Sequence, residues 1–110
     1  MNKEKFFDSI MEIVCDTMGV TKEQIVSTCR KMSLIDARSM FVFYASKSGF
    51  TTDYIMEKLK RKSPYSIQNL IEVYNQRVSS NYYQYMSSQV GRRIDFIKQQ
   101  LDNNNSLSCK

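Results

Sequence analysis

Residues 50–78 read FTTDYIMEKLKRKSPYSIQNLIEVYNQRV, which predicts two helices joined by a basic turn. Thr51 is a suitable N-cap for the first helix, which we expect to end near Leu59. The turn consists of three consecutive cations, Lys60, Arg61 and Lys62. Ser63 and Pro64 then suit the N-cap and first position of a second helix, because the N–H that proline lacks has no helical partner there.

The second helix has one apolar face and one polar face. Its apolar side chains recur at the spacing of a single helix face: Ile67, Leu70, Ile71, Tyr74 and Val78. The opposite side of its first turns carries polar residues that are mostly uncharged: Tyr65, Ser66, Gln68 and Asn69. Side chains of this kind bind base edges and phosphates in DNA. The pattern is therefore typical of a helix-turn-helix, with a recognition helix at about residues 64–78.

The composition favours a single small helical domain. The chain has 110 residues, of which 42% are hydrophobic and 12% aromatic, enough for one core. One proline and three glycines leave few turns, and no alternating strand pattern occurs. We expect an all-α bundle of five to six helices over residues 1–102, followed by a disordered tail at 103–110.

Further helices are predicted around the central pair. We expect them over residues 3–18, 22–28, 34–47 and 82–101. Thr21 and Gln24 have the spacing of a capping box, and Ser33 is the expected N-cap of the helix at 34–47. Asp36 would then lie in a first turn, where a carboxylate favours the positive end of the helix dipole. The run MFVFYA makes this helix the one expected to be most buried.

Positive charge is concentrated in the second half of the chain. The sequence has 16 Lys and Arg against 11 Asp and Glu, a formal charge of +5. From Lys58 to Arg93 there are seven cations and one anion, whereas residues 1–21 carry two cations and four anions. A basic half suits a polyanion such as DNA. The alternative is a solvated surface that keeps the protein soluble.

Enzymatic chemistry is disfavoured by the residues available. The sequence has no histidine, which removes histidine-based acid–base catalysis and histidine-ligated zinc. Its three cysteines, Cys15, Cys29 and Cys109, have no C-x-x-C spacing, so we expect reduced thiols. No phosphate-cradling glycine loop or close carboxylate pair with a plausible base role is present. We predict that the protein is not an enzyme and needs no cofactor or metal.

A membrane location is not expected. No apolar run approaches the roughly 18 residues that a membrane span requires. The N-terminal residues MNKEKFFDS also lack the apolar core of a signal peptide. With reduced thiols, these features favour a cytoplasmic location.

Four motifs follow one another in a characteristic order. They are GVTKEQI at 19–25, STCR at 27–30, IDAR at 35–38 and LKRKSPYSI at 59–67. This order resembles the C-terminal DNA-binding domain of the bacterial replication initiator DnaA, over about residues 6–101. The resemblance implies a Trp-repressor-like bundle that binds double-stranded DNA, here expected to act without the ATPase region of that family.

The resemblance also implies roles for individual residues. The arginine of the basic loop at 29–32, Arg30, would enter the minor groove, and Arg38 would contact the phosphate backbone. From the residues alone, Arg38 could instead pair with Asp36 or Asp53. The complete set of expected DNA-binding residues is Arg30, Lys31, Arg38, Lys60, Arg61, Lys62, Ser63, Tyr65, Ser66 and Asn69.

A second hypothesis follows from the recognition signature. The family motif G-G-R-D-H-T/S-T-V has an Asp and a His among its base readers, where this chain has Ser63 and Pro64. The chain would then be a protein-interaction or regulatory scaffold domain that keeps the fold without specific DNA reading. Its protein contact face or homodimer seam would be the last helix, which carries Tyr82, Tyr83 and Tyr85.

Overall fold

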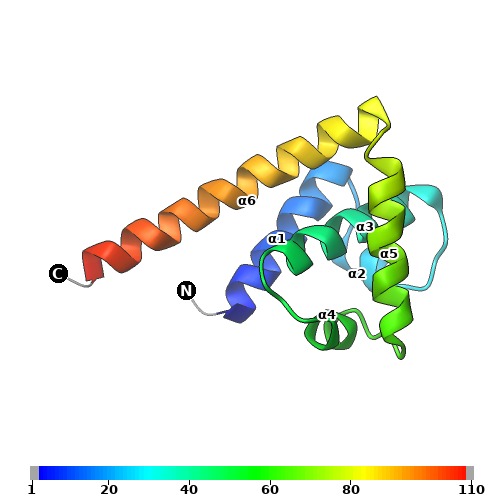
Figure 1. Ribbon diagram of the computed structural model, residues 1–110, viewed down its shortest axis with the longest axis horizontal. Coiled ribbons are helices and arrows are strands. Elements are labelled where there is room, and N and C mark those ends of the chain that lie inside the picture. Colours follow the sequence, from blue (N-terminus) through cyan, green and yellow to red (C-terminus); the bar gives the residue numbers. More distant parts are fainter. Residues whose placement is uncertain (1–2, 109–110) are drawn as a thin grey trace.

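The computed structural model describes residues 3–108, with residues 101–108 described by their backbone only. Within this range all regular secondary structure is helical, with no strand, as the sequence predicts. Six helices occur in the described range: α1 (Lys3–Met18), α2 (Lys22–Val26), α3 (Met32–Lys47), α4 (Thr52–Lys58), α5 (Pro64–Arg77) and α6 (Asn81–Ser108). Figure 1 shows α6 running diagonally past α1, so that its C-terminal half extends beyond the other helices.

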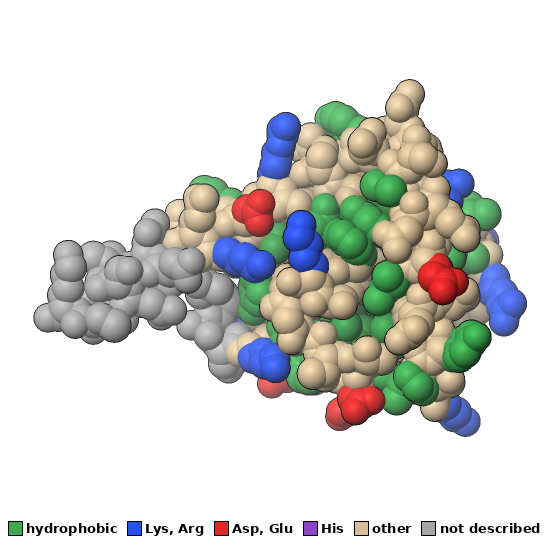
Figure 2. All heavy atoms as spheres, viewed as in Figure 1, with side chains coloured by type: hydrophobic (Ala, Val, Ile, Leu, Met, Phe, Trp, Pro, Cys, Tyr) green, Lys and Arg blue, Asp and Glu red, His purple; other side chains and the backbone are tan. Residues whose placement is uncertain are grey.

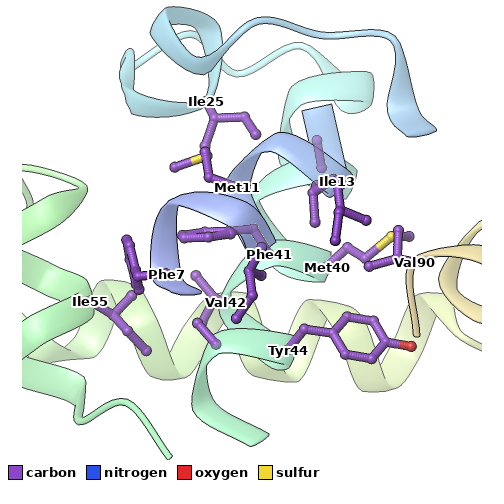
Figure 3. Packing of buried hydrophobic residues seen from close by; sticks show 14 of the residues in the cluster. Phe7, Met11, Ile13, Ile25, Met40, Phe41, Val42, Tyr44, Ile55 and Val90 are labelled. Atoms are coloured by element: carbon purple, nitrogen blue, oxygen red, sulfur yellow. The ribbon is translucent and has the colours of Figure 1, made fainter. Parts of the chain in front are cut away.

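The central helix of the bundle is α3. It packs against each of the other five helices, and most of its residues are buried, as the MFVFYA run predicts. Around its side chains lie Phe7 from α1, Ile25 from α2, Ile55 from α4 and Val90 from α6, all within one apolar cluster (Figure 3). One core therefore holds the six helices together.

Several helix starts have the predicted caps. The side chains of Thr21 and Gln24 form both hydrogen bonds of a capping box, at 2.9 and 3.1 Å. The Thr51 hydroxyl accepts a hydrogen bond from the backbone N–H of Tyr54 at 3.2 Å. Ser63 caps α5, with Pro64 at its first position. These ends are determined by neighbouring residues, which is why the sequence predicts them.

The start of α3 differs from the prediction. The helix begins at Met32 with Lys31 as its N-cap, so Ser33 does not cap it. Asp36 is therefore beyond the first turn, and its side chain is buried. Its carboxylate accepts two hydrogen bonds of 2.9 Å from the Arg77 guanidinium, which raise the pKa of Arg77. A tertiary ion pair with α5, rather than the helix dipole, accounts for this aspartate.

The last helix is longer than expected. Its backbone continues to Ser108, past the predicted end near Leu101, and covers most of the segment predicted to be disordered. Residues 109 and 110 of that segment lie outside the described residues. Residues 102–108, DNNNSLS, contain a single apolar residue and so form no apolar stripe in the sequence, and the predicted end depended on that stripe.

A hydrogen-bonded tyrosine cluster joins α3, α5 and α6. The Tyr44 hydroxyl donates to the Ser87 carbonyl at 2.7 Å, and the hydroxyls of Tyr44 and Tyr74 both lie within 2.9 Å of the Ser87 hydroxyl. Burial raises the pKa of Tyr44 to about 12. Phe43 stacks on Tyr74 with 3.8 Å between the ring centroids. These bonds leave the Tyr44 ring little freedom to move.

Gly91 allows α6 to lie against this ring. A Cβ atom added at Gly91 would be 3.0 Å from Tyr44 Oη and 3.5 Å from two ring carbons. Alanine would favour the helix by roughly 1 kcal/mol relative to glycine. We nevertheless expect Gly91→Ala to lower the stability by about 1 kcal/mol, because the contact overpacks a ring that cannot move aside.

Urea denaturation of single and double variants would check this expectation. In a Tyr44→Leu background the obstructing hydroxyl is gone, so the Gly91→Ala change should become stabilising there. A stabilising Gly91→Ala change in the parent chain would contradict the proposed overpacking.

Candidate nucleic-acid interface

The helices α4 and α5 flank the basic turn as predicted. α4 packs against α5, and the apolar side chains Ile55, Leu59 and Ile67 are completely buried. The opposite side of the first turns of α5 is open, and Tyr65 is 82% exposed. The start of α5 is therefore accessible to a large partner.

Lys60 lies just after the end of α4, in a conformation that usually requires glycine. Its φ angle is +55°, in the left-handed region. The N–H of Arg61 donates to the Met56 carbonyl and that of Lys60 to the Glu57 carbonyl, at 2.9 and 3.1 Å. These two bonds form a Schellman motif, in which glycine is the preferred residue at the Lys60 position. The lysine at this position therefore carries a conformational cost.

Replacing Lys60 by glycine tests the cost of its left-handed conformation. We expect Lys60→Gly to raise the stability by about 0.5–1 kcal/mol, because a left-handed conformation costs a lysine about that much. The matched control is Lys62→Gly, which removes the same charge at a residue without a positive φ. Thermal unfolding followed by circular dichroism should show a higher Tm for the first variant only. An equal change in both would contradict the strain at Lys60.

Arg38 holds the basic loop at 27–31 in place. Its guanidinium donates to the carbonyl oxygens of Gln24, Ile25, Ser27 and Cys29 at 2.6–3.0 Å, and to the Ser27 hydroxyl at 3.2 Å. The residue is only 4% exposed, and its pKa is lowered by burial and by the nearby charge of Arg61. The expected phosphate contact of this residue stays a prediction. The alternative, a pairing with Asp36 or Asp53, is wrong for Arg38. It satisfies carbonyls at the end of α2 instead.

Arg61 connects this loop to the basic turn. One of its Nη atoms donates to the Ser27 carbonyl at 3.0 Å, the same oxygen that accepts from Arg38. A single carbonyl thus joins the loop, α3 and the turn before α5. The position of the loop relative to the start of α5 is fixed by this junction.

Between the loop and α5 lies an open groove of about 380 Å³. Half of the predicted DNA-binding residues line it: Arg30, Arg38, Arg61, Ser66 and Asn69. The remaining lining residues are Thr28, Ile35, Leu70 and Val73, and none of the lining residues is acidic. Thr28, Ile35 and Val73 were not predicted as site residues, because their proximity depends on how α3, α5 and the loop pack.

The other predicted residues lie outside this groove. Lys60, Lys62, Ser63 and Tyr65 are exposed at the turn and at the start of α5. Lys31 is also exposed but borders a different hollow, beside Gly19 and Leu34. The Ser63 hydroxyl accepts a hydrogen bond from the Tyr65 N–H at 3.2 Å, so it acts as a cap. Figure 2 shows Lys and Arg side chains protruding at the edge beside α5 and the loop before α3.

The cations of this region are not neutralised by carboxylates of the described residues. The ion pairs among the described residues are Lys58–Glu4, Arg77–Asp36 and Arg93–Asp16. None of them includes Arg30, Lys31, Lys60, Arg61 or Lys62. The loop and the turn therefore present positive charge to the solvent, in an arrangement able to bind a polyanion.

Comparisons with known proteins add no family or relative. The chain matches none of the protein-family models, and the searches of curated proteins and of solved structures likewise gave no match. Among the described helices, none combines the length and the apolar character needed to cross a bilayer. The resemblance to the DNA-binding domain of DnaA therefore rests on the motifs of the sequence alone.

Proposed function

We propose that this protein binds double-stranded DNA, with α5 as the recognition helix of a helix-turn-helix in a Trp-repressor-like bundle. The observation that carries the proposal is the groove in which Arg30, Arg61 and Asn69 meet without an acidic residue. Cations of the loop and the turn would contact phosphates, and the polar first turns of α5 would face base edges in the major groove. The proposal includes a DnaA-like role in replication or transcription regulation, in the cytoplasm.

The exposed residues have different roles in the proposed DNA contact. Lys60 and Lys62 lie just before the start of α5, where the basic turn of a helix-turn-helix meets the DNA backbone. Arg30 extends from the loop that Arg38 and Arg61 hold. This position suits the DNA minor groove beside the major groove that α5 would occupy. Asn69 is exposed on α5, and an asparagine side chain can bind adenine through two hydrogen bonds.

A salt titration of binding to a duplex of random sequence tests the proposal. Fluorescence anisotropy of a labelled duplex should rise with protein at about 50 mM salt, and log K should fall linearly with log salt, by about 0.9 per neutralised phosphate. No change in anisotropy at this salt concentration would refute DNA binding.

The same experiment decides the second candidate function, a protein-interaction or scaffold domain. The substitution of Ser63, Pro64 and Tyr65 into the recognition signature favours this candidate, as does the exposure of Tyr82 and Tyr85 on α6, which are 64% and 61% exposed. A chain that binds no duplex at low salt, yet is folded, would be assigned to this class.

A further inference from the structure

The outer face of α6 carries exposed aromatic side chains that the proposed function does not use. Tyr82, Tyr85 and Phe96 are 64%, 61% and 61% exposed. The inner face of the same helix carries Tyr83, Val90 and Ile94, which are buried. Three aromatic rings exposed on one helix are unusual for a surface that contacts only water.

These rings belong to a regular seam. The residues Tyr82, Tyr85, Gln89, Arg92 and Phe96 are separated alternately by three and four positions. This is the spacing at which a helix presents one stripe to a partner helix, as in coiled coils. The seam contains no carboxylate, and Arg92 forms no ion pair with the described residues.

A groove adjoins one end of the seam. It has a volume of about 340 Å³ and is lined by Ile13 from α1 and by Arg92, Arg93, Phe96 and Ile97 from α6. The guanidinium of Arg93 is held by Asp16 at 2.8 Å, which fixes one wall of the groove. The apolar side chains in the lining suit an aromatic ring from outside.

We propose that this seam binds a second copy of the chain, with the two α6 helices antiparallel and a twofold axis beside Gln89. In a twofold contact residue i of one copy meets residue j of the other and the reverse. An axis beside Gln89 leaves an aromatic residue at each end of the seam, Tyr82 seven positions before it and Phe96 seven positions after it. In this register Tyr82 of one copy lies opposite Phe96 of the other and enters the groove beside it. The two ends of the contact are then identical aromatic pairs.

The charges favour antiparallel over parallel pairing. A parallel pair would place the two Arg92 guanidinium groups opposite each other. Antiparallel pairing about this axis places Arg92 within one residue of Tyr85 of the other copy, where a cation can lie over the aromatic ring. The two Gln89 side chains meet at the axis and can hydrogen-bond to each other.

The contact is short. The seam from Tyr82 to Phe96 is about 21 Å long at 1.5 Å per residue. One helix pair of this length buries less than the roughly 800 Å² per partner of a standard interface. The dimer is therefore expected to be weak, with a Kd of about 10–100 µM.

Sedimentation velocity over about 1–300 µM protein is the first test. The parent chain should shift from monomer to dimer across this range, and the variant Tyr82→Ala/Phe96→Ala should stay monomeric. The matched control is Tyr65→Ala, which removes a more exposed tyrosine outside the seam and should dimerise like the parent. A parent chain that is monomeric at 300 µM would overturn the proposal.

Cysteine cross-linking tests the register. In a chain with Cys29→Ser and Cys109→Ser, Gln89→Cys places two thiols across the axis, and mild oxidation should give a disulfide-linked dimer. The control Gln84→Cys lies on α6 about 140° around the helix and should cross-link at least tenfold more slowly. Equal rates, or faster cross-linking at position 84, would overturn the register. Neither test contains DNA, so their outcome is independent of the proposed DNA binding.

Discussion

Replacing Lys60, Arg61 and Lys62 together by alanine is expected to weaken binding to any DNA duplex by roughly 100-fold at about 0.1 M salt. Lys60 and Lys62 are exposed at the start of α5, and none of the three cations forms an ion pair with a carboxylate of the described residues. If all three cations contact phosphates, their removal should also reduce the slope of log K against log salt by nearly three. Anisotropy titrations at several salt concentrations measure both quantities.

A control of equal charge makes this result specific. The cations Lys22, Lys47 and Lys98 lie outside the groove and outside the basic turn. Their combined replacement by alanine lowers the net charge by the same amount and should weaken binding by no more than about threefold, through the long-range field alone. If the two triple variants bind alike, or the first retains the affinity of the parent at low salt, the basic turn does not contact DNA.

Replacing Arg38 by methionine is expected to lower the free energy of unfolding by about 3–4 kcal/mol. The change removes every hydrogen bond that its guanidinium donates to the carbonyls of residues 24–29, and it leaves partly buried acceptors without a donor. For a domain of this size the loss corresponds to a decrease in Tm of about 15–25 °C. Urea denaturation followed by circular dichroism measures it.

Arg30 is the matched control for Arg38. It is exposed in the same region and lines the same groove, so Arg30→Met should change the stability by less than about 0.5 kcal/mol while weakening DNA binding. The role that the DnaA resemblance implies for Arg38 predicts the opposite result, a stable variant with weak binding. Stability of Arg38→Met within 1 kcal/mol of the parent would contradict the structural role.

The local features of the fold could be predicted from the sequence, and its tertiary pairings could not. The capping box of Thr21 and Gln24 and the apolar face of α5 depend on residues a few positions apart. The partners of Arg38 and Asp36 depend on the packing of α3 against α2 and α5. An arginine and an aspartate within a mostly apolar helix indicate burial with partners, but the sequence does not identify those partners.

For the candidate site, too, the local features could be predicted from the sequence and the tertiary arrangement could not. The clustering of cations at 60–62 is visible in the sequence, and so is the basic character of the loop at 30–31. Only the packing shows that Arg30, Arg61 and Asn69 line one groove while Lys31 borders another. The seam of α6 was predictable in part. Its spacing is visible in the sequence, but the exposure of Tyr82 and the burial of Tyr83 are not.

The contact between Gly91 and Tyr44 has a consequence for the geometry of any assembly. Because α6 has no side chain at this crossing, its direction is fixed there against α3, the helix that also supports α5. The angle between α6 and α5, the proposed recognition helix, is then set by this crossing. If two copies pair through the seam at 82–96, this angle would hold their α5 helices at one separation. DNA targets would then be selected by the distance between their halves as well as by their bases.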